Sequence, residues 1–204
     1  MGLRENLASL AANPYPGRGI CVGLSDTGKS IFQVYWIMGR SANSRNRVFK
    51  AEGTALRTAP ADASKVEDAS LIIYNAMLEL PKVYIATNGD QTDTIHKAVA
   101  SGGSFPQALR TRTYEPDAPN YTARISCMCD LRGEKPDTYL SVIVKTPFGD
   151  GAERHCFEYE TLPRGAGYTV TTYAGDGTPL PRFAGEPYLL PLDGNAEEAA
   201  ETLW

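Results

Sequence analysis

A polar turn between a predicted strand and a predicted helix carries residue types that could bind a ligand. The segment Lys82–Thr94 reads Lys-Val-Tyr-Ile-Ala-Thr-Asn-Gly-Asp-Gln-Thr-Asp-Thr, an apolar run that ends at Asn88-Gly89. Helical spacing begins directly afterwards, so unpaired backbone N–H groups and the helix dipole could receive an anion there. A simpler interpretation is that Asp90 or Thr92 only caps the helix.

A second set of residues that could bind an anion lies in the basic segment Gly39–Arg47. It places Arg40, Arg45 and Arg47 among small hydroxyl and amide residues directly after a predicted strand, where loops often contact ligands. Guanidinium groups suit phosphate, and each charge-assisted hydrogen bond contributes roughly 1.5–3 kcal/mol. A solvated basic loop fits the same residues, so both interpretations stay open.

The segment Gly23–Ser30 matches the phosphate-loop pattern G-x-x-x-x-G-K-[ST] in full. That chemistry needs a helix that begins at the lysine, so that backbone amides face the phosphates. The residues that follow instead have the composition of a strand, with large apolar residues in both alternating sets. We therefore predict a hairpin of Ile20–Leu24 and Ile31–Met38, with the second strand buried on both faces, rather than a nucleotide phosphate loop.

The cysteine and histidine residues do not have the spacing of a metal site. Cys127 and Cys129 would share one face of a strand, and His155 adjoins Cys156. Zinc sites use wider cysteine spacing and four ligands, so thiols packed in the core are the better interpretation. We predict no metal, and these contexts offer no Ser-His-Asp or Cys-His relay.

The composition of the 204 residues limits the partners of the protein. A formal net charge of −4 argues against nucleic acid or an anionic membrane as the main partner. The N-terminal residues are charged and no apolar run approaches the length of a membrane span, so we expect neither a signal peptide nor a membrane helix. The four cysteines are then expected to be reduced, in a cytoplasmic protein. The sequence leaves open whether the chain forms a homo-oligomer.

The candidate residues must be positioned by the predicted helices and strands. Two helices grouped between two blocks of strands predict an α+β layered domain, because an alternating βαβ sheet would interleave them. The predicted elements are a helix near Leu3–Leu10, strands at Val48–Ala59, Leu71–Leu78, Lys82–Thr87, Thr122–Cys129, Thr138–Thr146, Arg154–Thr161 and Tyr168–Tyr173, helices at Thr92–Ser101, Ser104–Thr113 and Asn195–Trp204, and an irregular stretch at Pro179–Leu192.

An ordered set of short motifs resembles the archaeal-type inosine monophosphate (IMP) cyclohydrolase family. The motifs follow the family's order with similar gaps, from about residue 17 to residue 126. They are Gly17-Arg18, Arg40-Ser41 with Arg45, Tyr74-Asn75, Asn88-Gly89 with Thr92-Asp93-Thr94-Ile95, Tyr114-Glu115 with Asp117, and Arg124-Ile125. Two places depart from the family pattern: Ala42-Asn43 stands where the family has Phe-Pro, and Thr122-Ala123 follows an extra Tyr121 where the family has Thr-Pro.

The resemblance implies a fold, a reaction and a set of site residues. The fold is a four-layer α-β-β-α sandwich like that of N-terminal-nucleophile hydrolases, here a single domain over residues 1–204 with residues 1–16 as an N-terminal extension. The reaction closes 5-formamidoimidazole-4-carboxamide ribonucleotide to IMP with loss of water, without a cofactor, so the partner is a small purine ribonucleotide. The implied catalytic residues are Arg40, Tyr74 and Glu115, and the implied substrate-binding residues are Arg18, Ser41, Arg45, Asn75, Asn88, Gly89, Thr92, Asp93, Tyr114 and Arg124.

Two other functions remain open on the sequence. The altered loops would permit a purine-ribonucleotide-binding module that has lost catalysis. An amide hydrolase on the same fold would need a processed N-terminus that exposes a nucleophile such as Cys21.

Overall fold

Two antiparallel sheets form the body of the protein, in a computed structural model that describes residues 2–66, 68–70 and 72–204. The smaller sheet has the order β11 (Tyr188–Pro191), β10 (Ala166–Thr171), β1 (Arg18–Leu24) and β2 (Ile31–Ile37). The larger sheet has the order β3 (Arg47–Glu52), β4 (Ala55–Pro60), β5 (Asn75–Leu80), β6 (Val83–Thr87), β7 (Arg124–Asp130), β8 (Asp137–Lys145) and β9 (Ala152–Tyr159).

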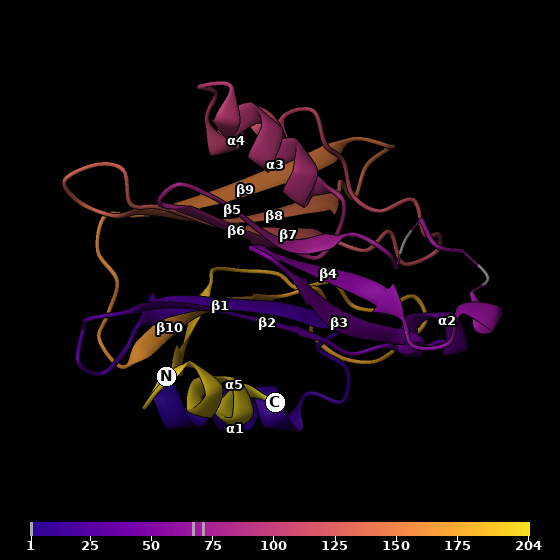
Figure 1. The fold of residues 1–204 in the computed structure, drawn as a ribbon. Helices are drawn as coiled ribbons and strands as arrows, with labels where there is room; N and C mark the ends of the chain where they lie inside the picture. The colour runs from indigo at the N-terminus through magenta and orange to yellow at the C-terminus, as the bar shows by residue number, and fades with distance from the viewer. Residues whose placement is uncertain (1, 67, 71) are drawn as a thin grey trace.

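Helices cover the outer face of each sheet (Figure 1). On the larger sheet, α3 (Gln91–Ala100) and α4 (Phe105–Leu109) bury Ile95 and Phe105 against residues of β6, β7 and β8. Below the smaller sheet lie α1 (Leu3–Ala12) and α5 (Ala196–Leu203), which pack around Trp36 and Leu190. The short α2 (Ala42–Arg45) and a 3₁₀ turn at Ala63–Lys65 lie in connections. This arrangement confirms the predicted α+β class.

The main hydrophobic core lies where the two sheets face each other. It includes Ile20 and Val22 of β1 together with Ile125 and Cys127 of β7 and Leu140 of β8, and all five side chains are buried. Cys129 belongs to the same cluster, and the Gln33 amide lies 3.2 Å from the Cys127 sulfur and 3.3 Å from the Cys129 sulfur. The prediction of packed core thiols is confirmed for Cys127 and Cys129.

Several predicted elements have the predicted neighbours. Strands β1 and β2 form the first hairpin, with Gly23 opposite Phe32, so a strand rather than a helix follows Ser30 and the phosphate-loop interpretation is excluded. Strands β5 and β6 form the second hairpin; its predicted first strand began at Leu71, which lies outside the described residues. Ser104 caps α4 and Asn195 caps α5, each with a capping box.

Three predictions about strands were wrong. Val48–Ala59 is not one strand: it falls on a hairpin of β3 and β4, because Gly53 with φ of 60° provides a turn. Strand β2 packs on both faces but is not fully buried, since it forms an edge of the smaller sheet and only Tyr35 and Trp36 are buried. The stretch Pro179–Leu192 is not wholly irregular, because β11 pairs with β10.

Candidate active site

A buried ion pair joins the start of β1 to the loop between α4 and β7. The Arg18 Nη2 atom donates to both carboxylate oxygens of Glu115, at 2.7 and 2.8 Å. Arg18 is 7% exposed and Glu115 is 3% exposed. The loop is held in place because the Glu115 backbone N–H donates to the Thr122 carbonyl at 2.9 Å and the Asp117 carboxylate accepts from the Thr122 backbone at 2.6 Å. The sequence-predicted residues Arg18 and Glu115 therefore form one centre, called the ion-pair centre below.

The ion-pair centre combines burial with compensating charge. Burial raises the pKa of Glu115 above its ordinary value of 4.5, although the charges of Arg18 and Arg124 pull it down. Burial acts to lower the pKa of Arg18, but the Glu115 carboxylate together with Tyr74, Tyr35 and Tyr173 outweighs it, and the net shift is upward. The Nε atoms of Arg18 and Arg124 are buried and have no hydrogen-bond partner within the described part of the chain. The centre thus offers a carboxylate more basic than usual and free donors beside it.

The turn at Asn88–Gln91 lies against this centre and is fixed by side-chain hydrogen bonds. The Asn88 amide donates to the Ala123 carbonyl at 2.8 Å, and its oxygen accepts from the backbone N–H of Ile125 at 2.9 Å and from the Gln91 amide at 2.9 Å. These bonds tie the end of β6 to the start of β7, which places the turn next to the Glu115 loop. The fully buried Asn88 side chain therefore holds the two segments together.

Glycine at position 89 leaves room for the side chains of the neighbouring site residues. An added Cβ there would lie 2.7 Å from Arg124 Nη1, 2.8 Å from Gln91 Oε1 and 3.5 Å from Glu115 Oε1. The backbone of Gly89 thus closely approaches the predicted residues Arg124 and Glu115. A side chain at this position would displace them.

The predicted capping role of Asp90 or Thr92 was wrong. Asp90 occupies the N-cap position of α3, but its side chain accepts no helix N–H. Its carboxylate instead accepts from Arg124 Nη1 at 2.7 Å and from Arg112 Nη2. The Thr92 hydroxyl donates to the Gly89 carbonyl at 3.1 Å. The basic side chains of the neighbouring segments outcompete the helix N–H groups for the Asp90 carboxylate, because they carry full charges.

Tyr74 meets a partner that the sequence did not indicate. Its hydroxyl lies 2.7 Å from that of Tyr35 on β2, and both residues are buried. Burial raises the pKa of Tyr74, while the charges of Arg18 and Arg47 lower it and that of Glu115 raises it. Tyr74 therefore lies within electrostatic reach of both the ion-pair centre and Arg47.

Other predicted site residues have contacts elsewhere. Arg40 donates to the Asp176 carboxylate and the Gly177 carbonyl, each at 2.7 Å, and its guanidinium lies over the Tyr15 ring. These contacts hold Arg40 at the surface rather than against Glu115 or Tyr74. The remaining residues make local contacts: the Asn75 amide donates to the Asp93 carboxylate at 2.9 Å, the Ser41 hydroxyl caps α2 by accepting from Ser44, and the Tyr114 hydroxyl donates to the Asp150 carbonyl at 3.2 Å.

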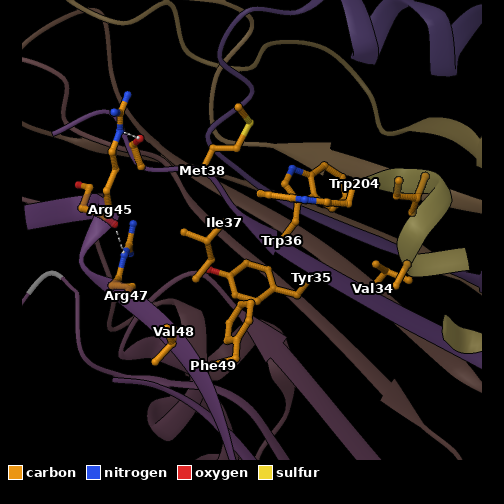
Figure 2. Close-up of a pocket in the computed structure, with 14 residues that line it drawn as sticks. Val34, Tyr35, Trp36, Ile37, Met38, Arg45, Arg47, Val48, Phe49 and Trp204 are labelled. Carbon is orange, nitrogen blue, oxygen red and sulfur yellow. Dashed lines mark hydrogen bonds between the residues drawn. The ribbon is translucent and has the colours of Figure 1, made fainter. Parts of the chain in front are cut away.

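A cavity of about 610 Å³ opens between β2, the segment from α2 to β3, and α5. Figure 2 shows Arg45 and Arg47 on one side of this cavity and Trp36 and Trp204 on the other. Tyr35 also lines the cavity, and its hydroxyl contacts Tyr74. Tyr35 therefore belongs both to the cavity wall and to the hydrogen-bonded tyrosine pair.

Comparison with known proteins decides the family. A model of the family described as IMP cyclohydrolase-like protein matches residues 15–204. The chain belongs to this family. The IMP cyclohydrolase of Methanopyrus kandleri is 30% identical over 73% of this chain and 78% of its own length. The IMP cyclohydrolase of Methanosphaera stadtmanae is 27% identical over 77% and 80%, and that of Methanocella arvoryzae is 28% identical over 64% and 63%.

The family assignment confirms the resemblance found in the ordered motifs and makes the protein an IMP cyclohydrolase-like enzyme. Sequence reasoning missed the partners of the motif residues, notably Tyr35 beside Tyr74, Gln91 beside Asn88, and Asp90 beside Arg124. Tyr35 and Tyr74 are 39 positions apart: Tyr35 lies on β2 of the smaller sheet, and Tyr74 directly precedes β5 of the larger sheet. No local spacing could reveal that pair. Within the described ranges, no helix is long and apolar enough to cross a bilayer.

Proposed function

We propose that this IMP cyclohydrolase-like enzyme closes 5-formamidoimidazole-4-carboxamide ribonucleotide to IMP with loss of water, the last step of de novo purine biosynthesis. The observation that carries the proposal is the buried Glu115 carboxylate, oriented by two hydrogen bonds from Arg18 and in electrostatic interaction with Tyr74. In this setting, a carboxylate with a raised pKa can accept a proton from a weakly nucleophilic amide.

The reaction is intramolecular and needs proton transfers but no redox step. The carboxamide nitrogen attacks the formyl carbon, the new C–N bond forms, and the nitrogen loses a proton to Glu115. The former formyl oxygen then leaves as water, while the formamido nitrogen loses its proton and the ring C=N bond forms. Holding the two groups together supplies much of the acceleration and requires no cofactor. General base catalysis by Glu115 adds about 10²–10⁴.

The remaining site residues have proposed roles in binding and charge stabilisation. Tyr74 donates a hydrogen bond to the developing oxyanion. The Nε donors of Arg18 and Arg124 are buried and have no partner among the described residues, and their proposed partners are substrate oxygens. Arg40 stays a proposed catalytic residue that would first have to leave Asp176 and Gly177. The proposed substrate contacts are Arg18, Ser41, Arg45, Asn75, Asn88, Gly89, Thr92, Asp93, Tyr114 and Arg124, with Asn88 acting through the position of its turn.

We further propose a single domain over residues 1–204, built as the four-layer α-β-β-α sandwich of N-terminal-nucleophile hydrolases. In support, helices cover the outer faces of two facing sheets. The proposed extension of residues 1–16 packs on the body, because Asn6 of α1 donates to the Leu189 carbonyl of β11 at 2.8 Å. The proposed location is the cytoplasm, and the proposed partner is a purine ribonucleotide rather than nucleic acid or a membrane.

Incubation of the purified protein with the formamido ribonucleotide, followed by the absorbance of the purine product, tests the proposed reaction. We expect IMP to form at a rate proportional to enzyme concentration. A flat trace from correctly folded protein would contradict the reaction, and IMP binding without turnover would select a non-catalytic ribonucleotide-binding module.

The same preparation tests the amide hydrolase alternative. Cys21 lies in the middle of β1, paired with Val34 on one side and Thr169 on the other, so its exposure as an N-terminus would remove half of the strand. We therefore expect the intact mass of the active protein to match a chain that has not been cut before Cys21.

A further inference from the structure

The guanidinium of Arg47 lacks the partners that a buried charge requires. Arg47 is the first residue of β3, and its Nε donates to the Ser44 carbonyl at 2.8 Å. Both terminal nitrogens are buried, and within the described part of the chain neither has a hydrogen-bond partner. Leaving charged donors buried and unpaired is costly, so a charged donor group in this state points to a ligand that the protein binds.

The groups around Arg47 are also donors. The Tyr35 and Tyr74 hydroxyls bond to each other, and one O–H of such a pair remains free to donate. No other partner of either hydroxyl is found among the described residues. The charge of Arg47 acts to lower the pKa of both tyrosines. No carboxylate in the described ranges forms an ion pair with Arg47. A cluster of donors with no carboxylate partner in the described ranges fits an oxyanion.

The surroundings of this donor cluster limit the size and shape of the ligand. Arg47 and Tyr35 both line the cavity of about 610 Å³, whose other walls include the aromatic side chains Trp36, Phe49 and Trp204 (Figure 2). Cavities of roughly 300–1,000 Å³ hold small organic ligands. Arg45 adds a second cation at the same cavity. A ligand with one anionic end and a larger organic body fits a cavity with arginines on one side and aromatic side chains on the other.

We propose that Arg47, together with the Tyr35 hydroxyl, binds the 5′-phosphate of the purine ribonucleotide in this cavity, an inference that rests on the proposed function. The hydrogen-bonded pair of Tyr35 and Tyr74 interacts electrostatically with both Arg47 and Arg18, so we place the reacting end of the nucleotide toward the ion-pair centre and its phosphate end at Arg47. Because the terminal nitrogens of Arg47 are covered, binding includes a turn of its guanidinium toward the cavity.

The chain carries its own reporter for this cavity. It has two tryptophans, Trp36 and Trp204, and both line the cavity. Tryptophan fluorescence should therefore respond to a ligand that enters it. Titration with IMP and with inosine, which lacks the phosphate, measures the contribution of the phosphate. We expect IMP to bind more tightly than inosine.

The variant Arg47→Met keeps the apolar stem and removes the charge. We expect it to weaken IMP binding about 10- to 100-fold, the loss that follows from removing charge-assisted hydrogen bonds, and to leave inosine affinity unchanged. Unchanged inosine affinity also shows that the variant is folded. The IMP affinity of Arg47→Lys should lie between that of the wild type and that of Arg47→Met. Arg57→Met is the matched control, because Arg57 lies on the neighbouring strand, pairs with Glu52 and does not line the cavity; its IMP affinity should equal that of the wild type.

Preference for IMP over inosine that persists in Arg47→Met would overturn the inference. If the protein converts the formamido ribonucleotide but Arg47→Met still prefers IMP over inosine, the phosphate inference is wrong and the proposed function stands. If IMP binding depends on Arg47 but the protein forms no IMP, the phosphate inference stands and the proposed reaction is wrong.

Discussion

The ion-pair centre and the cavity wall around Arg47 both interact electrostatically with the pair of Tyr35 and Tyr74, and their charges are compensated in opposite ways. In the centre, both oxygens of Glu115 accept from Arg18, and Asp90 binds Arg124. At the cavity wall, Arg47 has a buried guanidinium with unpaired ends and no carboxylate beside it in the described ranges. Both regions use buried arginine, yet only the first contains its own anion.

This difference separates two tasks of the site. A group that carries out chemistry must be held in one orientation before the substrate arrives, and internal pairing achieves this. A group that binds an anionic substrate must have donors that no protein acceptor occupies, and this lowers the stability of the protein without the substrate. The comparison therefore predicts that the two regions respond differently to the same kind of mutation.

Glu115→Gln should have the largest effect, on catalysis. The amide preserves the shape and one acceptor of the side chain but cannot take the proton, so we expect turnover to fall about 10²–10⁴-fold. IMP should still bind measurably. Steady-state assays and product titration test this, with the exposed Glu79→Gln as the control. Near-normal turnover in Glu115→Gln would remove Glu115 from the mechanism.

Arg18→Met should strongly destabilise the protein. It leaves the Glu115 carboxylate buried without its partner, which typically costs about 3–5 kcal/mol. The free energy of unfolding from urea denaturation measures the loss. Arg132→Met removes a partner from the half-exposed pair with Asp130 and should cost no more than ~1 kcal/mol. Equal losses in the two variants would show that the ion-pair centre is not a buried, coupled pair.

The pH dependence of kcat/KM should report the raised pKa of Glu115. As the pH falls, the carboxylate takes up a proton and can no longer act as base, so the acid limb should lie above pH 4.5. The charge of Arg124 lowers the pKa of Glu115, and Arg124→Gln should therefore move this limb to higher pH. A limb that stays in place in Arg124→Gln would show that the two groups are not electrostatically coupled.

Arg47→Met should have the smallest effect on stability, because it removes the one hydrogen bond from Nε to the Ser44 carbonyl, while the terminal nitrogens have no partner among the described residues. We expect a change in the free energy of unfolding within about 1 kcal/mol of zero, and an apolar replacement of an unpaired buried charge can even stabilise. Urea denaturation alongside Arg18→Met provides the comparison. A loss as large as that of Arg18→Met would place Arg47 in the structural framework.

The sequence predicted local elements well and tertiary partners poorly. The hairpin of β1 and β2, the helix after Asn88 and the caps at Ser104 and Asn195 follow from local turn and capping chemistry. The order of short motifs was enough to predict the family.

The errors arise where distant segments compete with local preference. Asp90 could have capped α3, but Arg124 and Arg112 bind its carboxylate instead. Strand β11 is a short edge strand in a proline-rich stretch, and only pairing with β10 defines it. Tyr35 was predicted as part of a strand, and its role depends on the approach of Tyr74 across the two sheets. Such pairs are set by packing rather than by spacing along the chain.

The most direct test is the steady-state kinetics of the wild type, Glu115→Gln and Arg47→Met with the formamido ribonucleotide as substrate. If catalysis and phosphate binding are separate tasks, Glu115→Gln should lower kcat and largely keep the substrate affinity. Arg47→Met should raise KM about 10-fold or more, with a smaller change in kcat. A normal kcat in Glu115→Gln, or a normal KM in Arg47→Met, would contradict this division of the site.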